Sequence, residues 1–134
     1  MDVNIDISPD TLDLTSVARE ELITAYIELP KSYNPKDIDV STLHLAKNIP
    51  AQKRLIDIVD HDRDGVFELM VKFERRLVAD HLRDYLRKTK KVEGRVSLSL
   101  TGVIDGKRFE GTDTIFVTLK AQSRMTSNPN MEDK

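Results

Sequence analysis

The chain has 134 residues, a length that suits a single domain with a continuous core and no need of disulfides. Hydrophobic residues make up 39% and charged residues 33%, as in a globular protein with a highly charged surface. The net charge of −2 gives no global argument for a nucleic-acid or membrane partner, and the absence of cysteine excludes disulfides, thiolate zinc sites and cysteine nucleophiles. No apolar run approaches the roughly 20 residues that a membrane-spanning helix needs.

Two-residue alternation of apolar and polar side chains predicts short strands in the first half of the chain. These strands cover residues 3–7, 22–29, 40–45, 55–59 and 68–73. The turn-rich connection after Pro30 is expected to contain one helical turn after Pro35, and Asn48-Ile49-Pro50 is expected to be a break. The strands 55–59 and 68–73 flank a loop of eight residues, so we expect them to pair as an antiparallel hairpin.

The period changes to that of a helix between Arg75 and Lys88. Val78, Leu82, Tyr85 and Leu86 recur at helical spacing, which predicts an amphipathic helix that carries these side chains on its core face. The basic run 88–91 and Gly94 suit the C-terminus of that helix. We expect the helix to cover an open end or edge of the β-structure.

Alternation resumes in the last third of the chain and predicts strands at residues 96–104, 107–111 and 114–119. Asp105-Gly106 predicts a two-residue hairpin turn, because glycine tolerates the positive φ of a type I′ turn. Residues 121–134 are polar and irregular and are expected to form a disordered tail. About seven or eight short strands with one helix therefore predict a single antiparallel β-sandwich domain over residues 1–120.

An acidic segment at residues 60–68, with the sequence DHDRDGVFE, is the most informative feature of the chain. It places aspartates at every second position, then a glycine that permits a sharp bend, then another carboxylate. Carboxylates this close repel one another unless they share a cation, and Ca²⁺ takes six to eight oxygens at roughly 2.3–2.6 Å, whereas Mg²⁺ prefers a smaller octahedral shell that keeps several waters. We therefore expect a Ca²⁺ site whose ligands are the side chains of Asp60, Asp62, Asp64 and Glu68 and the backbone carbonyl of Val66.

The spacing of this segment separates two kinds of calcium loop. An EF-hand begins in the same way but requires a bidentate glutamate at its twelfth position, which here is Val71, so an EF-hand is excluded. The segment instead resembles the calcium hairpins of integrin-type propeller repeats, in which Asp-x-Asp-x-Asp-Gly-x-x-Asp joins two β-strands, with Glu68 in place of the usual last aspartate. The alternative is a solvated acidic turn in which aspartate and glycine only satisfy turn geometry, and His61 and Arg63 reduce the repulsion.

Four sequence blocks, in this order, resemble a β-sandwich module of archaeal and bacterial surface or secreted proteins. They are TAYIELP at 24–30, DIDVST at 37–42, the acidic hairpin that runs into LMVKF at 60–73, and FEGTDTI at 109–115. The resemblance implies an immunoglobulin-like, non-catalytic module with a calcium hairpin, an extracellular or cell-surface location, and an unknown protein or glycan partner. The predicted fold class is thus mainly β, an antiparallel immunoglobulin-like β-sandwich with one inserted amphipathic helix at about residues 75–88.

A second hypothesis rests on charge. Residues 72–95 contain nine basic and four acidic side chains, a net charge of +5. An intracellular interaction domain could use the basic helix at 75–91 to dock an acidic protein or nucleic acid, with no metal. Within that helix only Tyr85 is aromatic, so stacking on bases is disfavoured and nucleic acid is not the expected partner. Residues 1–6 lack the basic start and apolar core of a secretory signal, which leaves a cytoplasmic protein or a mature fragment as alternatives.

Catalytic signals are weak. The chain has no recognisable nucleophile turn and no glycine-rich phosphate loop, so we do not expect an enzyme. His81 with Asp80 and Asp84 could form a metal-binding helix face, but a solvated charged face is the preferred interpretation. The primary function hypothesis is therefore a calcium-binding β-sandwich module for adhesion, spacing or binding of a protein or other ligand, expected to be monomeric.

Overall fold

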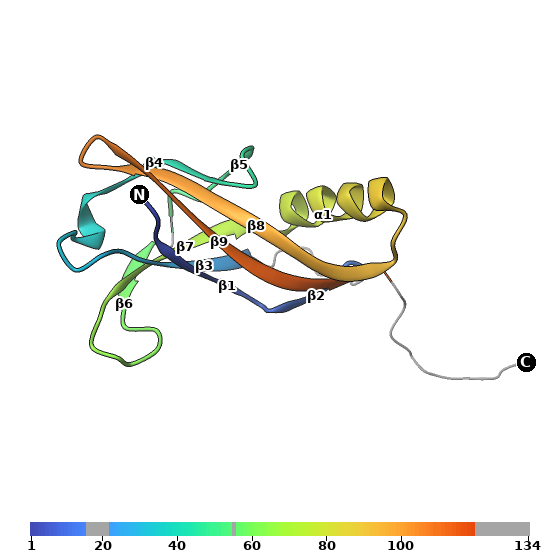
Figure 1. Cartoon of the computed structure of the whole chain (residues 1–134), viewed down its shortest axis with the longest axis horizontal. Coiled ribbons are helices and arrows are strands. Elements are labelled where there is room, and N and C mark those ends of the chain that lie inside the picture. The colour runs from blue at the N-terminus through green and yellow to red at the C-terminus, as the bar shows by residue number, and fades with distance from the viewer. Residues whose placement is uncertain (16–21, 55, 120–134) are drawn as a thin grey trace, which may run out of the picture.

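The computed structural model describes residues 1–15, 22–54 and 56–119, and it is mainly β, with two sheets and one α-helix (Figure 1). The predicted disordered tail at 121–134 and the first residue of the predicted strand 55–59 lie outside the described residues. The first sheet has the order β1 (Asn4–Ser8), β3 (Leu22–Glu28), β7 (Glu68–Glu74), β6 (Asp57–Val59). The second sheet has the order β2 (Thr11–Asp13), β9 (Lys107–Thr118), β8 (Glu93–Ile104), β4 (Ile38–Leu45), β5 (Ile49–Pro50).

The predicted turns and the predicted hairpin are confirmed. The hairpin β6–β7 is antiparallel, with Val59 opposite Glu68, as predicted. Asp105 and Gly106 both have positive φ, 50° and 77°, and join β8 to β9, as a type I′ turn requires. A short 3₁₀ helix, η1 (Pro35–Asp37), begins at the expected proline.

Two predictions about the strands are wrong, and one strand was missed. Asn48-Ile49-Pro50 is not a plain break, because β5 pairs with the end of β4. Residues 107–118 form one continuous strand instead of two, because Gly111 occupies an inward-facing place in the alternation and does not interrupt it. The strand β2 was not predicted, and it pairs in parallel with β9, so the β-structure is not purely antiparallel.

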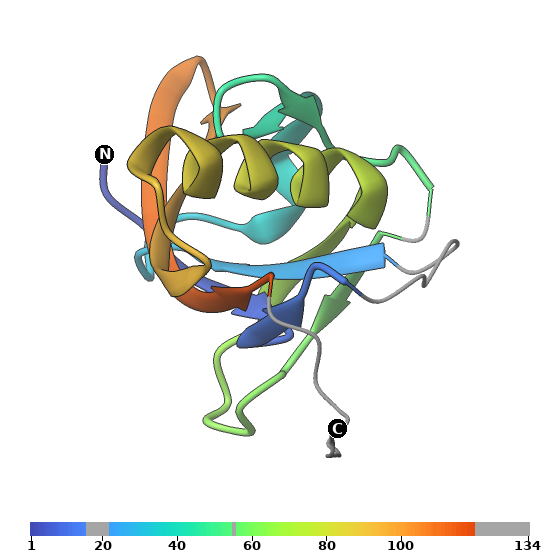
Figure 2. The same ribbon diagram turned by 90° about the vertical axis from the view of Figure 1, so that its right-hand side faces the viewer.

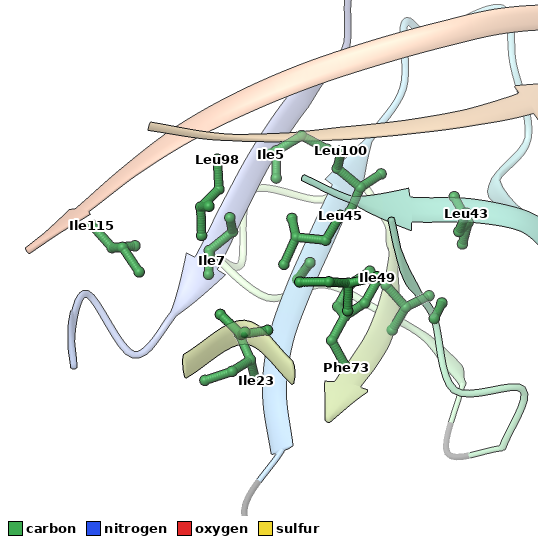
Figure 3. Close-up of a cluster of buried hydrophobic side chains, with 14 of the residues drawn as sticks. Ile5, Ile7, Ile23, Leu43, Leu45, Ile49, Phe73, Leu98, Leu100 and Ile115 are labelled. Atoms are coloured by element: carbon green, nitrogen blue, oxygen red, sulfur yellow. The ribbon is translucent and has the colours of Figure 1, made fainter. Parts of the chain in front are cut away.

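The core lies between the two sheets (Figure 3). Inward side chains alternate with exposed ones along each strand, as in β1, where Ile5 and Ile7 are buried and their neighbours are exposed. The strands β8 and β9 pair over their whole length and curl, which gives the second sheet the shape of a half-barrel. The side chains labelled in Figure 3 come from both sheets and meet in the middle: Ile5, Ile7, Ile23, Leu43, Leu45, Ile49, Phe73, Leu98, Leu100 and Ile115.

The helix α1 (Arg75–Thr89) follows β7 directly and lies across the open end of the two sheets (Figure 2). It buries Val78, Leu82 and Leu86 as predicted, but Tyr85 is 38% exposed. Val78, Leu82 and Leu86 follow one another at intervals of four residues and form the buried stripe of the helix, and Tyr85 lies beside this stripe. The prediction of a core-facing tyrosine is therefore wrong.

The helix ends at Lys90, which adopts a left-handed conformation with φ 57°. Its backbone N–H and that of Lys91 donate to the last carbonyls of the helix. The predicted terminator, Gly94, lies in β8 instead. None of the helices among the described residues is long and apolar enough to cross a membrane.

The N-terminal segment links the two sheets. The backbone N–H of Val3 donates to the Glu110 carbonyl of β9 at 3.0 Å, after which β1 continues beside β3 in the other sheet. This approach requires glycine at position 111, because a Cβ there would lie 2.7 Å from the Val3 carbonyl oxygen and would overlap the Ile5 side chain. The β1 end of the first sheet is thus held close to β9.

Substituting Gly111→Ala should destabilise the protein by roughly 1–3 kcal/mol, because β1 must shift to admit the methyl group. Urea denaturation followed by circular dichroism measures the change. Gly94→Ala is the matched control, since the nearest atom to its Cβ would be Lys91 Cδ at 4.0 Å. Equal stability of the two variants would show that the contact between β1 and β9 does not need the glycine.

Candidate metal centre

The acidic loop at residues 60–67 joins β6 to β7. Carboxylates of the loop accept hydrogen bonds from its backbone and so determine its shape. Both oxygens of Asp60 accept backbone hydrogen bonds, from Asp64 N at 3.1 Å and from Gly65 N at 3.0 Å. Asp64 Oδ1 accepts from Val66 N at 2.8 Å. Gly65 has a φ of 85°, which a residue with a side chain rarely adopts. These bonds draw the loop back over the end of the first sheet.

Four carboxylates gather where this loop meets the sheet. Oxygen atoms from Glu28, Asp62, Asp64 and Glu68 all lie within 4.8 Å of one another, a group that could hold a metal ion. Three of the five ligands expected from the sequence belong to this group. Asp60 and Val66 do not: the side chain of Asp60 is engaged in shaping the loop, and ligation by these two residues stays a prediction.

The fourth carboxylate, Glu28, was not found by sequence reasoning. It ends β3, whose register with β7 places Ile27 opposite Leu69. Continued by one residue, this register places Glu28 beside Glu68, and like charges in such cross-strand positions destabilise a sheet. The one signal in the sequence is that Glu28 is the only charged residue of the predicted strand 22–29.

Glu68 is the most constrained member of the cluster, because its residue is only 3% exposed. Its Oε1 accepts a hydrogen bond from His61 N at 2.8 Å, whereas Oε2 is buried and has no hydrogen-bond partner among the described residues. Burial raises the pKa of Glu68, and the nearby charges of Asp62, Glu28 and Asp64 raise it further, although the His61 hydrogen bond opposes them. A buried and unpaired carboxylate oxygen is costly unless a cation or a proton meets it.

The other members of the cluster show the same competition between charges. Loss of solvent and then the charges of Asp64 and Asp62 raise the pKa of Glu28. The pKa of Asp64 is lowered, first by the hydrogen bond from Val66 N–H. The loop therefore stabilises the anionic form of Asp64, while the two glutamates remain under repulsion that a bound cation would relieve.

His61 fastens the loop to the first sheet. Its ring stacks on Tyr26 of β3, with centroids 3.6 Å apart and planes 7° from parallel, and its Nε2 lies 3.1 Å from Asp6 Oδ2 of β1. The imidazole therefore pairs with Asp6 of the sheet rather than with the carboxylates of its own loop. This anchoring holds Asp62 and Asp64 over Glu28 and Glu68.

The basic helix contains no second metal group among the described residues. Asp80 pairs with Arg83 at 3.0 Å and Asp84 with Lys88 at 3.0 Å, so these carboxylates are engaged by cations instead of gathering around His81. Arg83 also donates to the Leu14 carbonyl at 2.9 Å, which ties the helix to the segment after β2. Much of the positive charge seen in the sequence is therefore used within the fold.

Comparisons with known proteins assign no family to the chain. No protein-family model matches it, no curated protein matches it, and no solved structure matches it. The resemblances to surface modules and to propeller calcium hairpins therefore stay predictions from the sequence. The functional argument rests on the geometry of the site.

Substituting Glu68→Gln should stabilise the metal-free protein by on the order of 1 kcal/mol at pH 7, because it removes a buried charge while keeping an acceptor for His61 N–H. The folded-state pKa of Glu68 is raised, so the ionised carboxylate costs stability at neutral pH and this cost disappears as the pH falls through that pKa. The advantage of the variant should therefore shrink as the pH is lowered from 7 toward 4.5. Urea denaturation in EDTA across this range measures it.

The control for this experiment is Glu74→Gln. Glu74 pairs with Arg76 at 3.2 Å in an exposed ion pair, so its loss should change stability little. If Glu68→Gln were only as stable as the parent protein at pH 7, the buried oxygen would carry no penalty, and the argument that this cluster binds a cation would fail.

Proposed function

We propose that this chain is a non-catalytic, calcium-binding β-sandwich module with immunoglobulin-like topology that serves adhesion, spacing or ligand binding. The observation that carries the proposal is the cluster of Glu28, Asp62, Asp64 and Glu68, in which a buried carboxylate oxygen has no partner among the described residues. Surface loops often carry aspartates, but they rarely converge on an unpaired oxygen inside the protein.

The dimensions of the cluster suit Ca²⁺. Two oxygens that bind one Ca²⁺ can lie no farther apart than twice the bond length, which is roughly 4.6–5.2 Å. The four carboxylates fall within this limit at 4.8 Å. Their donors are all hard oxygens and none is nitrogen or sulfur, which favours Ca²⁺ or Mg²⁺ over the transition metals. Of these two, Ca²⁺ is better served by a site that supplies several carboxylates and little water.

The strand order supports an immunoglobulin-like assignment. With β1 and β2 taken as the two parts of strand A and the rest lettered along the chain, the first sheet reads A-B-E-D. The second sheet then reads A′-G-F-C-C′. An immunoglobulin domain sets ABED against a GFC sheet that can be extended by C′. The helix α1 falls between strands E and F, so it is an insertion that leaves this order intact.

A bound ion would act on both stability and shape. Ligands from the β6–β7 hairpin and from the end of β3 would be joined by one ion, which favours the folded state by mass action. The same ion would lock the loop that projects from this end of the sandwich (Figure 1). A rigid end loop on a stable scaffold suits a module that binds or spaces other molecules.

The alternative, an intracellular domain that docks an acidic protein or nucleic acid through the basic helix, has less support. Of the cations on the helix, Arg83 is tied to Leu14 and Asp80, while Lys88 pairs with Asp84. Lys90 and Lys91 are exposed at the helix C-terminus, where the backbone carbonyls favour positive charge without any partner. We therefore prefer the calcium-binding function.

Addition of Ca²⁺ to metal-stripped protein should raise the free energy of unfolding by about 2.7 kcal/mol when free Ca²⁺ is one hundred times the dissociation constant. The double substitution Asp62→Asn, Asp64→Asn should abolish the accompanying rise in melting temperature. Glu28→Gln should lower the affinity for Ca²⁺ by about ten-fold, since it removes one ligand charge that lies outside the loop. Calorimetric titration and thermal melts measure these effects.

Asp57→Asn is the matched control, because Asp57 lies in the same hairpin but its Oδ1 accepts from Ile58 N and it is not part of the cluster. Its calcium response should equal that of the parent protein. An unchanged response in the double variant would reject the loop carboxylates as ligands. A response to Mg²⁺ as strong as that to Ca²⁺ would contradict the choice of ion.

A further inference from the structure

A hollow of about 180 Å³ opens beside the carboxylate cluster on the outer face of the first sheet. Three of the proposed calcium ligands line it, namely Glu28, Asp62 and Glu68, so an ion held among them would border the hollow. The rest of the lining comes from Asn4, Ile5 and Asp6 of β1 and from the stacked rings of Tyr26 and His61. The hollow and the carboxylate cluster therefore share these three side chains.

We propose that this hollow binds a neutral polyol, in practice a single sugar ring, through hydroxyl groups that complete the coordination of the calcium ion. The inference rests on the proposed calcium site and deepens it by naming a ligand class. The sugar hydroxyls would fill those coordination positions of the ion that the four carboxylates do not occupy. The chemistry of this ligand follows from charge, shape and the groups on the wall.

The number of ligands leaves room for an exogenous molecule. Ca²⁺ takes six to eight oxygens, and four carboxylates supply between four and eight depending on how many bind with both oxygens. Glu68 Oε1 accepts from His61 N and Asp64 Oδ1 accepts from Val66 N, so these two carboxylates already share one oxygen each with the backbone. This sharing favours one-oxygen binding by both, which leaves positions in the coordination shell for oxygens of a molecule in the hollow, which Glu68 lines. Two adjacent hydroxyls of a sugar present paired oxygens that can fill such positions.

Charge selects a neutral ligand over a charged one. Four carboxylates and one Ca²⁺ leave a net charge of −2, and Asp6 adds a further carboxylate to the wall. An anionic ligand would be repelled by this excess, and a cationic group has no lone pair with which to bind the ion. Hydroxyl groups avoid both difficulties, because their oxygens bind the ion while their protons donate to the surrounding carboxylates.

The size and lining of the hollow fit a single ring. Sites for drug-sized molecules span roughly 300–1,000 Å³, so this hollow suits a smaller occupant. Asn4 is exposed and offers an amide that can donate to and accept from a hydroxyl. Tyr26 and His61 place an aromatic pair in the lining, against which the C–H groups of a sugar could pack.

Saturation-transfer NMR on the full chain tests the inference with the methyl glycosides of mannose, glucose, galactose, fucose and N-acetylglucosamine. At least one glycoside should receive saturation in the presence of Ca²⁺, and the signal should vanish when EDTA is added. Asn4→Ala should weaken the binding of that glycoside by about five-fold, the loss expected for one hydrogen bond. Its calcium affinity should be unchanged, because Asn4 is not part of the carboxylate cluster. Asn48→Ala, an exposed asparagine in the β4–β5 turn, is the control and should bind as the parent protein does.

The outcomes separate this inference from the proposed function. If calorimetry shows calcium binding but no glycoside receives saturation, the sugar inference is wrong and the calcium module stands. If Ca²⁺ does not bind, both proposals fall. Sugar binding that survives EDTA, or that Asn4→Ala leaves unaltered, would place the ligand elsewhere and overturn the inference.

Discussion

The repulsion among four carboxylates at one end of the first sheet is the constraint from which the rest of the site follows. A solvated cluster of this kind could relax by moving its side chains into water. Glu68 cannot, because it is 3% exposed and lies on β7, between β3 and β6. Its neighbours Glu28, Asp62 and Asp64 then converge on a carboxylate whose Oε2 is buried and has no hydrogen-bond partner in the part of the chain that the structure describes. A shared cation relieves all four charges at once, which no single hydrogen-bond donor could do.

The cluster and the helix lie at opposite ends of the two sheets (Figure 1). The helix α1 seals the core at its own end with Val78, Leu82 and Leu86. At the other end, the acidic loop between β6 and β7 projects from the first sheet (Figure 1). Binding residues often lie on loops of this kind, because the paired strands behind them are rigid.

Features that depend on residues close together in the sequence were predictable. Features that depend on the pairing of strands far apart in the sequence were not. The Asp105-Gly106 turn, the β6–β7 hairpin and the helix each follow from local patterns. Glu28 joins the site only because β3 pairs with β7 in one register, which no local pattern specifies. The strands β2 and β5 are three and two residues long, too short to show alternation, and exist because neighbouring strands hold them.

The position of His61 explains how such a loop can hold its shape before an ion arrives. A loop of mutually repelling aspartates would sample many conformations, and ordering it would consume part of the binding energy of the ion. Here the ring of His61 is stacked on Tyr26 and paired with Asp6, while Asp60 draws the backbone of Asp64 and Gly65 inward. These contacts involve groups other than the carboxylates of the cluster, so they remain in place whether or not the ion is bound. The conformational entropy is therefore lost during folding, and an ion that entered the cluster would meet carboxylates that are already converged.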